Sequence, residues 1–229
     1  SDLNPALTHV TISGNTADDD GGGMYLYSSS NPTLSNVTIS GNTSESRGGG
    51  MCLSTSNPTL THVTISGNTA ENGGGMRLIS SNPTLTHVTI SDNTAGNFGG
   101  GMYLYNDSNP ALTHVTISGN TAENGGGMLL DSSNPTLTHV IISNNTADDD
   151  GGGMYLDNSN PNLTNVTIAN NTANYGGGMF LFYSDPTLTH VTISNNTAIA
   201  GNGGGMRLDS SNPNLTHVTI ANNTAEDNG

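Results

Sequence analysis

The chain has 229 residues, a formal net charge of −15 and three basic residues, which argues against nucleic acid or an anionic membrane as a partner. Its single cysteine excludes an internal disulfide framework, and no run of about 20 apolar residues predicts a membrane span. The negative charge favours solubility of a glycine-rich chain and opposes lateral association.

One motif recurs nine times along the chain. The consensus is NPTLTHVTISGNTA, a short variable loop, GGGMxL, and a second short loop, and the GGGMxL part occurs eight times. A period of 20–50 residues is typical of a solenoid, a propeller or an array, and constant strands between variable loops predict a fixed cross-section. Residues 1–229 are therefore expected to form one repeat domain. Its copies are marked by prolines 25–27 residues apart, namely Pro5, Pro32, Pro58, Pro83, Pro110, Pro135, Pro161, Pro186 and Pro213.

The second copy shows the elements expected in every coil. Alternation predicts a strand with Val37 and Ile39 inside. After a corner and the glycine triplet, a second strand is expected with Met51 and Leu53 inside and Cys52 outside. Proline and glycine at the corners exclude long helices. The predicted fold class is all-β, a right-handed parallel β-helix (solenoid) of about nine coils with 25–27 residues each.

An asparagine occupies the corner of every coil. Stacked amides can hydrogen-bond along the axis of a solenoid. An inward amide also satisfies corner backbone groups that no strand pairs. We therefore expect a structural ladder made of Asn15, Asn42, Asn68, Asn93, Asn120, Asn145, Asn171, Asn196 and Asn223.

A leucine-rich-repeat-like binding module is the competing fold. The spacing Leu7-x-x-Val10-x-Ile12-x-x-Asn15 fits that template, as do its copies. Against it, the return segment GGGMxL predicts a second strand. A helix in each repeat would favour the leucine-rich horseshoe. A left-handed β-helix would need a hexapeptide period, which is absent.

The coil resembles a known family. The I-x-x-N of Ile39–Asn42 and the GGG-M of Gly48–Met51 resemble the paired F-x-x-N and GGA-I motifs of the chlamydial polymorphic outer-membrane protein family. Isoleucine replaces phenylalanine, and Gly-Met replaces Ala-Ile. The whole coil is similar to repeat arrays of secreted bacterial surface proteins. The resemblance covers the entire chain and implies a passenger or stalk region outside a cell, often adhesive.

Hydroxyl side chains predict a possible binding face. A flat T-x-T lattice on a solenoid resembles insect ice-binding proteins, and such a face is an alternative site for ice or carbohydrate. Serines in the neighbouring column, and Ile141 within this one, make the lattice irregular. Threonine is also simply a good residue for an exposed strand. The column contains Thr11, Thr38, Thr64, Thr89, Thr116, Thr167, Thr192 and Thr219.

Acidic residues cluster in the first loop of several coils. Carboxylates beside carbonyl oxygens suit Ca²⁺, so Asp148, Asp149 and Asp150 are a candidate metal site. The nonapeptide G-G-x-G-x-D typical of calcium-binding solenoids is absent, and a solvated acidic face is the competing interpretation. Asp131 and Asp157 are expected to face outward in the second loop of adjacent coils. No other cofactor is expected.

Seven histidines share one column, with asparagine in the other two coils. Their rings are expected on the surface, about 4.8 Å apart in consecutive coils. Proton sensing and transition-metal capture are possible uses, and simple ring stacking is the alternative. The histidines are His9, His62, His87, His114, His139, His190 and His217.

We find no pattern that predicts catalysis. Catalytic residues of a solenoid should interrupt the consensus, and Cys52, Ile141 and Arg47 do so without a base beside them that the other coils lack. The sequence favours a structural or adhesive segment of an extracellular surface protein or fibre, with surface glycans as candidate partners. Neither end of the sequence resembles a capping segment that would cover the last coil. We therefore expect further coils of a longer chain, or end-to-end self-association into a filament.

Overall fold

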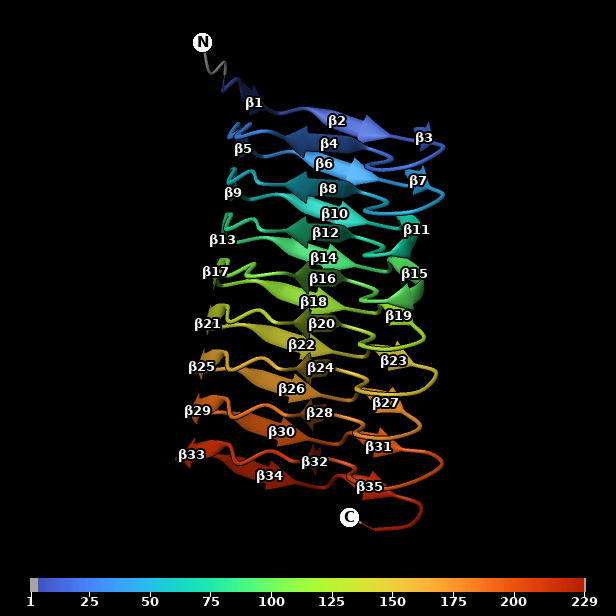
Figure 1. Cartoon of the computed structure of the whole chain (residues 1–229), viewed down its shortest axis with the longest axis vertical. Helices are drawn as coiled ribbons and strands as arrows, with labels where there is room; N and C mark the ends of the chain where they lie inside the picture. Colours follow the sequence, from blue (N-terminus) through green and yellow to red (C-terminus); the bar gives the residue numbers. More distant parts are fainter. Residues whose placement is uncertain (1–3, 229) are drawn as a thin grey trace.

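The computed structural model describes residues 4–228 as a stack of coils that runs from one end of the molecule to the other (Figure 1). Each coil contributes up to four short strands, and strands of successive coils pair in parallel. No helix occurs in this part of the chain. This contradicts the competing leucine-rich horseshoe and confirms the all-β prediction. A helix long and apolar enough to cross a membrane is accordingly not found within residues 4–228.

Two nine-stranded sheets are built from the NPTLTHVTIS part of the motif. The first sheet contains β1 (Ala6–Thr8), β5 (Thr33–Ser35), β9 (Thr59–Thr61), β13 (Thr84–Thr86), β17 (Ala111–Thr113), β21 (Thr136–Thr138), β25 (Asn162–Thr164), β29 (Thr187–Thr189) and β33 (Asn214–Thr216). The second sheet contains β2 (Thr11–Ser13), β6 (Thr38–Ser40), β10 (Thr64–Ser66), β14 (Thr89–Ser91), β18 (Thr116–Ser118), β22 (Ile141–Ser143), β26 (Thr167–Ala169), β30 (Thr192–Ser194) and β34 (Thr219–Ala221).

The other two sheets lie on either side of the first loop. The third sheet contains β3 (Thr16–Ala17), β7 (Thr43–Ser44), β11 (Thr69–Asn72), β15 (Thr94–Phe98), β19 (Thr121–Ala122), β23 (Thr146–Ala147), β27 (Thr172–Ala173), β31 (Thr197–Ala198) and β35 (Thr224–Ala225). The fourth sheet has eight strands, β4 (Met24–Tyr27), β8 (Met51–Ser54), β12 (Met76–Ile79), β16 (Met102–Tyr105), β20 (Met128–Asp131), β24 (Met154–Asp157), β28 (Met179–Phe182) and β32 (Met206–Asp209).

Equivalent residues of neighbouring coils lie directly above one another. Ile39 of β6 pairs in register with Ile65 of β10, and Met51 of β8 with Met76 of β12. Leucine, valine, isoleucine and methionine columns therefore form one continuous core along the axis. The predicted inward residues Val37, Ile39, Met51 and Leu53 are at most 1% exposed, which confirms their assignment to the core.

The glycine triplet allows the coils to approach closely. Gly125 has a φ of +65°, in the left-handed region that disfavours side chains. A Cβ on Gly126 would lie 2.4 Å from the carbonyl oxygen of Thr146 in the next coil. Alanine at either place would strain or displace the backbone. The triplet is therefore a packing requirement of the fourth sheet, not a flexible linker.

The structure has more strands per coil than the sequence predicts. Alternation identified the strands of the second and fourth sheets, whereas Thr43, expected in a corner, and Ser44, expected in the first loop, form strand β7. Short two-residue strands give no periodic signal, so their pairing depends on the stacked neighbours. Residues 1–3 and 229 lie outside the described residues. The prediction that both ends are uncapped falls partly on these residues.

Candidate functional site

The nine corner asparagines form a continuous hydrogen-bonded column. In the seven inner coils these side chains are fully buried. Each Nδ2–H donates to Oδ1 of the asparagine in the next coil at 2.9–3.0 Å, and to an isoleucine carbonyl of the preceding coil at 3.0–3.1 Å. Each Oδ1 also accepts the backbone N–H of the preceding asparagine. These amides face the interior, where they hold the corner and cannot reach a ligand.

A second buried polar column, made of serines, was not predicted from the sequence. Each serine lies directly before an Asn-Pro or Asp-Pro pair and is fully buried. Its Oγ accepts the backbone N–H of the serine one coil earlier at 2.9–3.2 Å and donates to a carbonyl at the end of the fourth-sheet strand. Its members are Ser56, Ser81, Ser108, Ser133, Ser159 and Ser184.

The predicted threonine column lies on the outer side of the second sheet. Its members stack in register, as in the pairing of Thr64 with Thr89 and of Thr89 with Thr116. Ile141 interrupts the column between Thr116 and Thr167 and is 47% exposed. The column is a regular polar surface with one apolar interruption, and its use as a binding face stays a prediction.

The histidine column is exposed, and its rings stack as expected. Ring centroids of neighbouring histidines lie 4.8–5.1 Å apart, with interplanar angles of 3–19°. Every position in the column has a φ near +54°, including Asn36 and Asn165. Histidine and asparagine are among the few residues that tolerate this left-handed conformation. Backbone geometry thus explains why asparagine replaces histidine in two coils.

The candidate calcium residues lie in the loop between β23 and β24. Asp148 and Asp149 are exposed and Asp150 is half-buried. Within residues 4–228, no group of three or more histidine, cysteine, aspartate or glutamate side chains is arranged to hold a metal ion. Burial raises the pKa of Asp150 to about 6, and the charge of Asp149 adds to this, while Arg207 opposes it. The Ca²⁺ site stays a prediction without a coordination geometry to support it.

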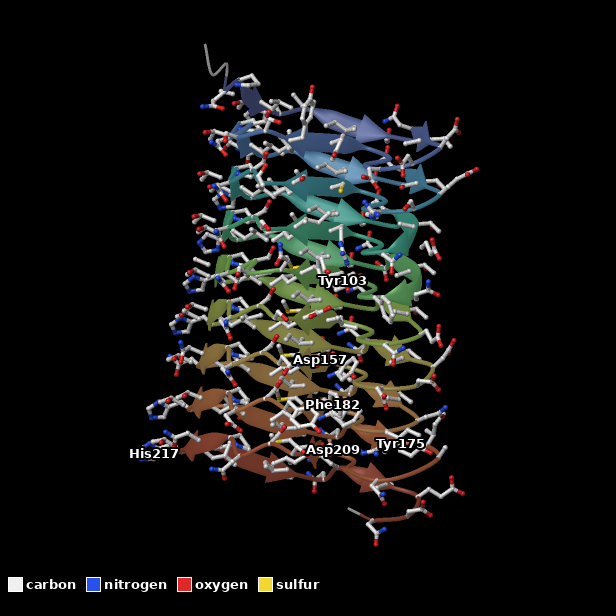
Figure 2. The ribbon with its side chains drawn as sticks, viewed as in Figure 1. Tyr103, Asp157, Tyr175, Phe182, Asp209 and His217 are labelled. Carbon is white, nitrogen blue, oxygen red and sulfur yellow. The ribbon has the colours of Figure 1, made fainter. Side chains whose placement is uncertain are left out.

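All aromatic side chains other than histidine gather on one side of the molecule, which we call the aromatic face. It consists of the outer side of the fourth sheet, the residue before each glycine triplet and the residue after each fourth-sheet strand. Figure 2 shows Tyr103, Asp157, Phe182 and Asp209 following one another along it. The face also carries all three arginines. Its aromatic members are Tyr25, Tyr27, Phe98, Tyr103, Tyr105, Tyr155, Tyr175, Phe180, Phe182 and Tyr183.

The middle column of this face is largely buried. Residues two places after the last glycine of each triplet point away from the core, yet several are nearly inaccessible. Cys52 lies between Tyr25 and Arg77. Its side chain points away from the core, as predicted, but it is fully buried and not exposed to solvent as an outside position implied. Burial raises the pKa of its thiol to about 12, and a protonated thiol is a poor nucleophile.

Two arginines of the face lie against aromatic rings. The guanidinium carbon of Arg77 is 3.5 Å from the centroid of Tyr103 and 5.0 Å from that of Tyr105. That of Arg207 is 4.6 Å from Tyr175 and 4.7 Å from Phe180. Arg77 is only 6% exposed, and burial lowers its pKa. Since its Nε and Nη1 have no hydrogen-bond partner among the described residues, the rings are its main stabilising contacts.

Between these two arginines lies a hollow of about 190 Å³. Its floor is Leu129, with Tyr103 and Tyr155 in the neighbouring coils on either side. The remaining lining residues are Phe98, Asp131 and Asp157. We call this hollow the aromatic–acidic pocket.

The two carboxylates of the pocket lie side by side. Asp131 and Asp157 pair in register at the ends of β20 and β24, so both are strand residues, where a loop position was expected. Burial raises the pKa of Asp157, as does the neighbouring charge of Asp131, while a hydrogen bond from Asn158 lowers it. Burial, together with nearby carboxylates, raises the pKa of Tyr155 to about 12. The pocket is therefore apolar on its floor and negative on one wall.

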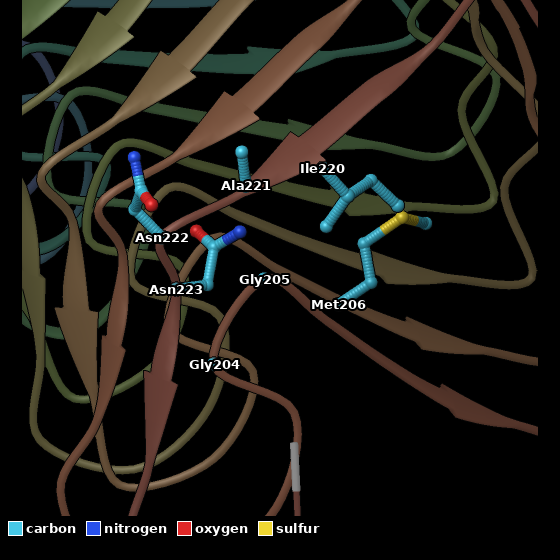
Figure 3. Close-up of a pocket in the computed structure, with 7 residues that line it drawn as sticks. All are labelled: Gly204, Gly205, Met206, Ile220, Ala221, Asn222 and Asn223. Atoms are coloured by element: carbon cyan, nitrogen blue, oxygen red, sulfur yellow. The ribbon is translucent and has the colours of Figure 1, made fainter.

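A larger hollow, of about 360 Å³, lies on the last coil (Figure 3). Its lining includes Gly205, Met206, Ile220 and Asn223, whose equivalents elsewhere are covered by the following coil. Figure 3 shows the side chains of Met206, Ile220 and Asn223 around it. It is lined by core and corner residues and contains no titratable or nucleophilic side chain.

The aromatic face was not predicted from the sequence, because the residues before each glycine triplet and after the leucine of GGGMxL were assigned to variable loops. A signal existed, since comparison of the eight copies of GGGMxL shows tyrosine, phenylalanine and arginine, together with aspartate, replacing one another around this segment. The three exceptions singled out for catalysis do not form one site. Arg47 pairs with Asp20 at 3.6 Å, Cys52 is buried nearby, and Ile141 lies on the second sheet.

Comparison with known proteins supports the fold. The family model described as right handed beta helix region matches residues 6–127 and 85–229, which confirms the predicted right-handed parallel β-helix. No curated protein matches. A crystal structure of a TibC-catalyzed, hyper-glycosylated TibA fragment aligns over 99% of this chain and 100% of its own, with 17% identity and a TM-score of 0.15. At that score the alignment supports no functional argument, and the resemblance to the chlamydial family receives no support from these matches.

Proposed function

We propose, from the premise that this chain belongs to the right-handed β-helix family, that it is a structural solenoid segment of an extracellular surface protein or fibre and makes adhesive contacts through its aromatic face. One observation carries the adhesive part. Every tyrosine, phenylalanine and arginine of the chain lies on this face, whereas the outer sides of the other sheets repeat threonine, serine and asparagine. Aromatic and arginine side chains are enriched where proteins bind partners.

The structural part of the proposal rests on the core and its ladders. Continuous apolar columns and hydrogen-bonded asparagine and serine columns join each coil to the next. Such a stack holds the aromatic side chains at fixed positions, so little conformational freedom is lost on binding. The extracellular location rests on the resemblance of the coil to repeat arrays of secreted surface proteins. Antibody labelling of intact cells of the source organism tests it, and labelling only after lysis would contradict it.

Adhesion is tested with the whole chain on a printed array of surface glycans. We expect binding that is lost when the exposed tyrosines Tyr25, Tyr27 and Tyr105 are replaced by serine. The matched control changes Thr64 and Thr89 of the second sheet to serine and should bind as the original does. Equal binding by both variants would place adhesion elsewhere on the surface. Absence of binding by the original chain would leave the structural part standing and reject glycan adhesion.

Coil stacking belongs to the same proposal. Leu208, Leu215 and Ile220 of the last coil are 44–48% exposed, whereas their equivalents in inner coils are fully buried. We propose that a second copy of the chain stacks on this surface, which is the end-to-end self-association expected from the sequence. Light scattering of the chain should detect elongated oligomers, and Ile220→Asp should reduce them. A concentration-independent monomer would contradict the second copy as the occupant.

A further inference from the structure

We propose that the aromatic–acidic pocket binds an organic cation, specifically a guanidinium group. This deepens the proposed function, because it assigns a ligand chemistry to one place on the aromatic face. The pocket unites three aromatic rings, from Phe98, Tyr103 and Tyr155, with the carboxylates of Asp131 and Asp157. Rings attract cations through their negative faces, and carboxylates accept the N–H groups of a guanidinium in a planar fork.

The molecule already places a guanidinium group against aromatic rings on both sides of the pocket. Along the middle column of the aromatic face the side chains run Arg77, Tyr103, Leu129, Tyr155, Phe180 and Arg207. At each end the chain's own guanidinium lies against aromatic rings. In the middle, Leu129 is an uncharged side chain shorter than arginine or tyrosine, and the space above it is the pocket. The middle column therefore has a third place beside aromatic rings, and there the chain supplies no guanidinium of its own.

The charges around the pocket favour a cation. Asp131 and Asp157 stand beside each other on paired strands, and like charges so placed destabilise a sheet. Each carboxylate accepts a hydrogen bond from the residue after it, Ser132 and Asn158, but neither forms an ion pair with a basic side chain of the described residues. A bound cation would relieve this repulsion. An anionic ligand would increase it.

The size of the pocket limits what can enter. At about 190 Å³ it is smaller than the roughly 300–1,000 Å³ of typical small-molecule sites, so it fits a head group and not a whole ligand. Its apolar floor offers Leu129 and its walls offer ring faces, which suit the flat, weakly hydrated guanidinium better than a strongly hydrated ammonium. The source of the group is either a free guanidinium compound or an arginine side chain of a partner.

The test is an NMR titration of the whole chain with four probes. N-acetylarginine amide should shift the signals of Tyr103, Leu129 and Tyr155 in a saturable way, whereas the citrulline analogue, which has the same shape without the charge, should not. Methylguanidine and a capped Gly-Arg-Gly peptide separate the two sources. Tighter binding of the peptide points to a partner's side chain, and equal binding points to a free compound.

Two variants examine the pocket itself. Asp131→Asn combined with Asp157→Asn should weaken binding about tenfold or more, since it removes both charges while keeping the side-chain shape. Asp209→Asn, in the same column but outside the pocket, is the matched control and should bind normally. Leu129→Arg should place the chain's own guanidinium in the pocket, raise the melting temperature and abolish binding. Its melting temperature reports folding independently of the probes.

Several results would overturn the proposal. Unchanged binding in the double variant, normal binding in Leu129→Arg, or equal binding of the citrulline analogue would each place the interaction elsewhere or make it nonspecific. No saturable shift with any probe would reject the cation site. Adhesion to glycans depends on Tyr25, Tyr27 and Tyr105, which do not line the pocket, so that proposal can stand when this one fails.

Discussion

At the scale of single residues, the corner asparagines account for much of the register between coils. One amide group makes four hydrogen bonds, since Asn120 accepts from the backbone and side chain of Asn93 and donates to Asn145 and to the carbonyl of Ile90. All of these partners are buried: Asn93 and Asn145 lie in the same corner of the neighbouring coils, and Ile90 belongs to strand β14. An aspartate would lack the donors and a serine would lack the reach, so asparagine fits the position.

We expect Asn120→Ala to lower the free energy of unfolding by roughly 1–3 kcal/mol more than Thr116→Ala, because it leaves buried donors and acceptors unpaired. Thr116 is a suitable control because it lies in the same coil, on the half-exposed outer side of β18. Urea denaturation followed by circular dichroism measures the difference. Equal midpoints for the two variants would show that the column contributes nothing special to stability.

Asp150 makes the free energy of unfolding decrease as the pH rises, which is the opposite of the effect of a carboxyl group with a lowered pKa. Burial raises the pKa of this carboxyl from 3.8 to about 6 in the folded protein. The folded state therefore binds the proton more tightly than the unfolded state. The resulting stabilisation is fully present below about pH 3.8 and is lost as the pH rises through about 6.

Asp150→Asn should accordingly raise the melting temperature at pH 7–8, where it removes a half-buried charge, and have little effect near pH 4. Melting curves at several pH values check this. Asp148→Asn, which changes an exposed carboxylate of the same loop, is the comparison and should show no such pH-dependent gain. A melting difference for Asp150→Asn that stays constant from pH 4 to 8 would contradict the assignment.

At the scale of elements, the fourth sheet differs from the other three because its two sides have different roles. Its inner side repeats methionine and leucine, and the glycine triplets before it pack backbone against backbone. Its outer side changes from coil to coil and carries the aromatic face. Close packing on one side keeps the strands in register, so substitutions on the other side are tolerated without loss of the fold.

Gly126→Ala should destabilise the protein by roughly 1–3 kcal/mol or more, because its Cβ would lie 2.4 Å from a carbonyl oxygen of the next coil. Gly96→Ala is the matched control, since the nearest atoms to a Cβ there are at 3.7 Å and φ is not left-handed. Thermal melts of the two variants measure the effect. If Gly126→Ala and Gly96→Ala have the same melting temperature, the triplet does not limit the spacing of the coils.

At the scale of the whole molecule, nine coils spaced about 4.8 Å apart make a stack roughly 40 Å long. Each surface column is therefore a row of side chains at a constant interval, and a row of one residue type becomes a lattice. The threonine column approaches this condition, but Ile141 interrupts it near the middle of the stack. The aromatic face is instead a row of different groups, which suits recognition of particular ligands.

We expect no thermal hysteresis and no ice shaping at high protein concentration, since ice recognition requires a regular lattice over the whole face. Nanolitre osmometry measures both. Ice shaping that disappears in Thr116→Tyr, but persists in Tyr105→Ser, would transfer the function to the second sheet. That outcome would favour the threonine column over the aromatic face.

The repeat alone was sufficient to predict the β-helix, its single core and its asparagine column. The reason is that a solenoid makes the same choice in every coil, so nine copies reveal which positions cannot vary. Val37, Ile39, Met51 and Leu53 were assigned to the inside from alternation alone, and each is buried. The positive φ shared by the histidine column was not predicted, because backbone conformation leaves only a weak trace in residue choice.

What the sequence could not determine is which variable residues meet in space. Phe98, Tyr103, Leu129, Asp131 and Tyr155 belong to three different coils, and neither their spacing nor their types form a motif along the chain. Parallel stacking converts a separation of about 26 residues into the distance between adjacent strands. Only that stacking brings the rings, the leucine floor and the carboxylates together around one pocket, because each contact depends on residues far apart in sequence.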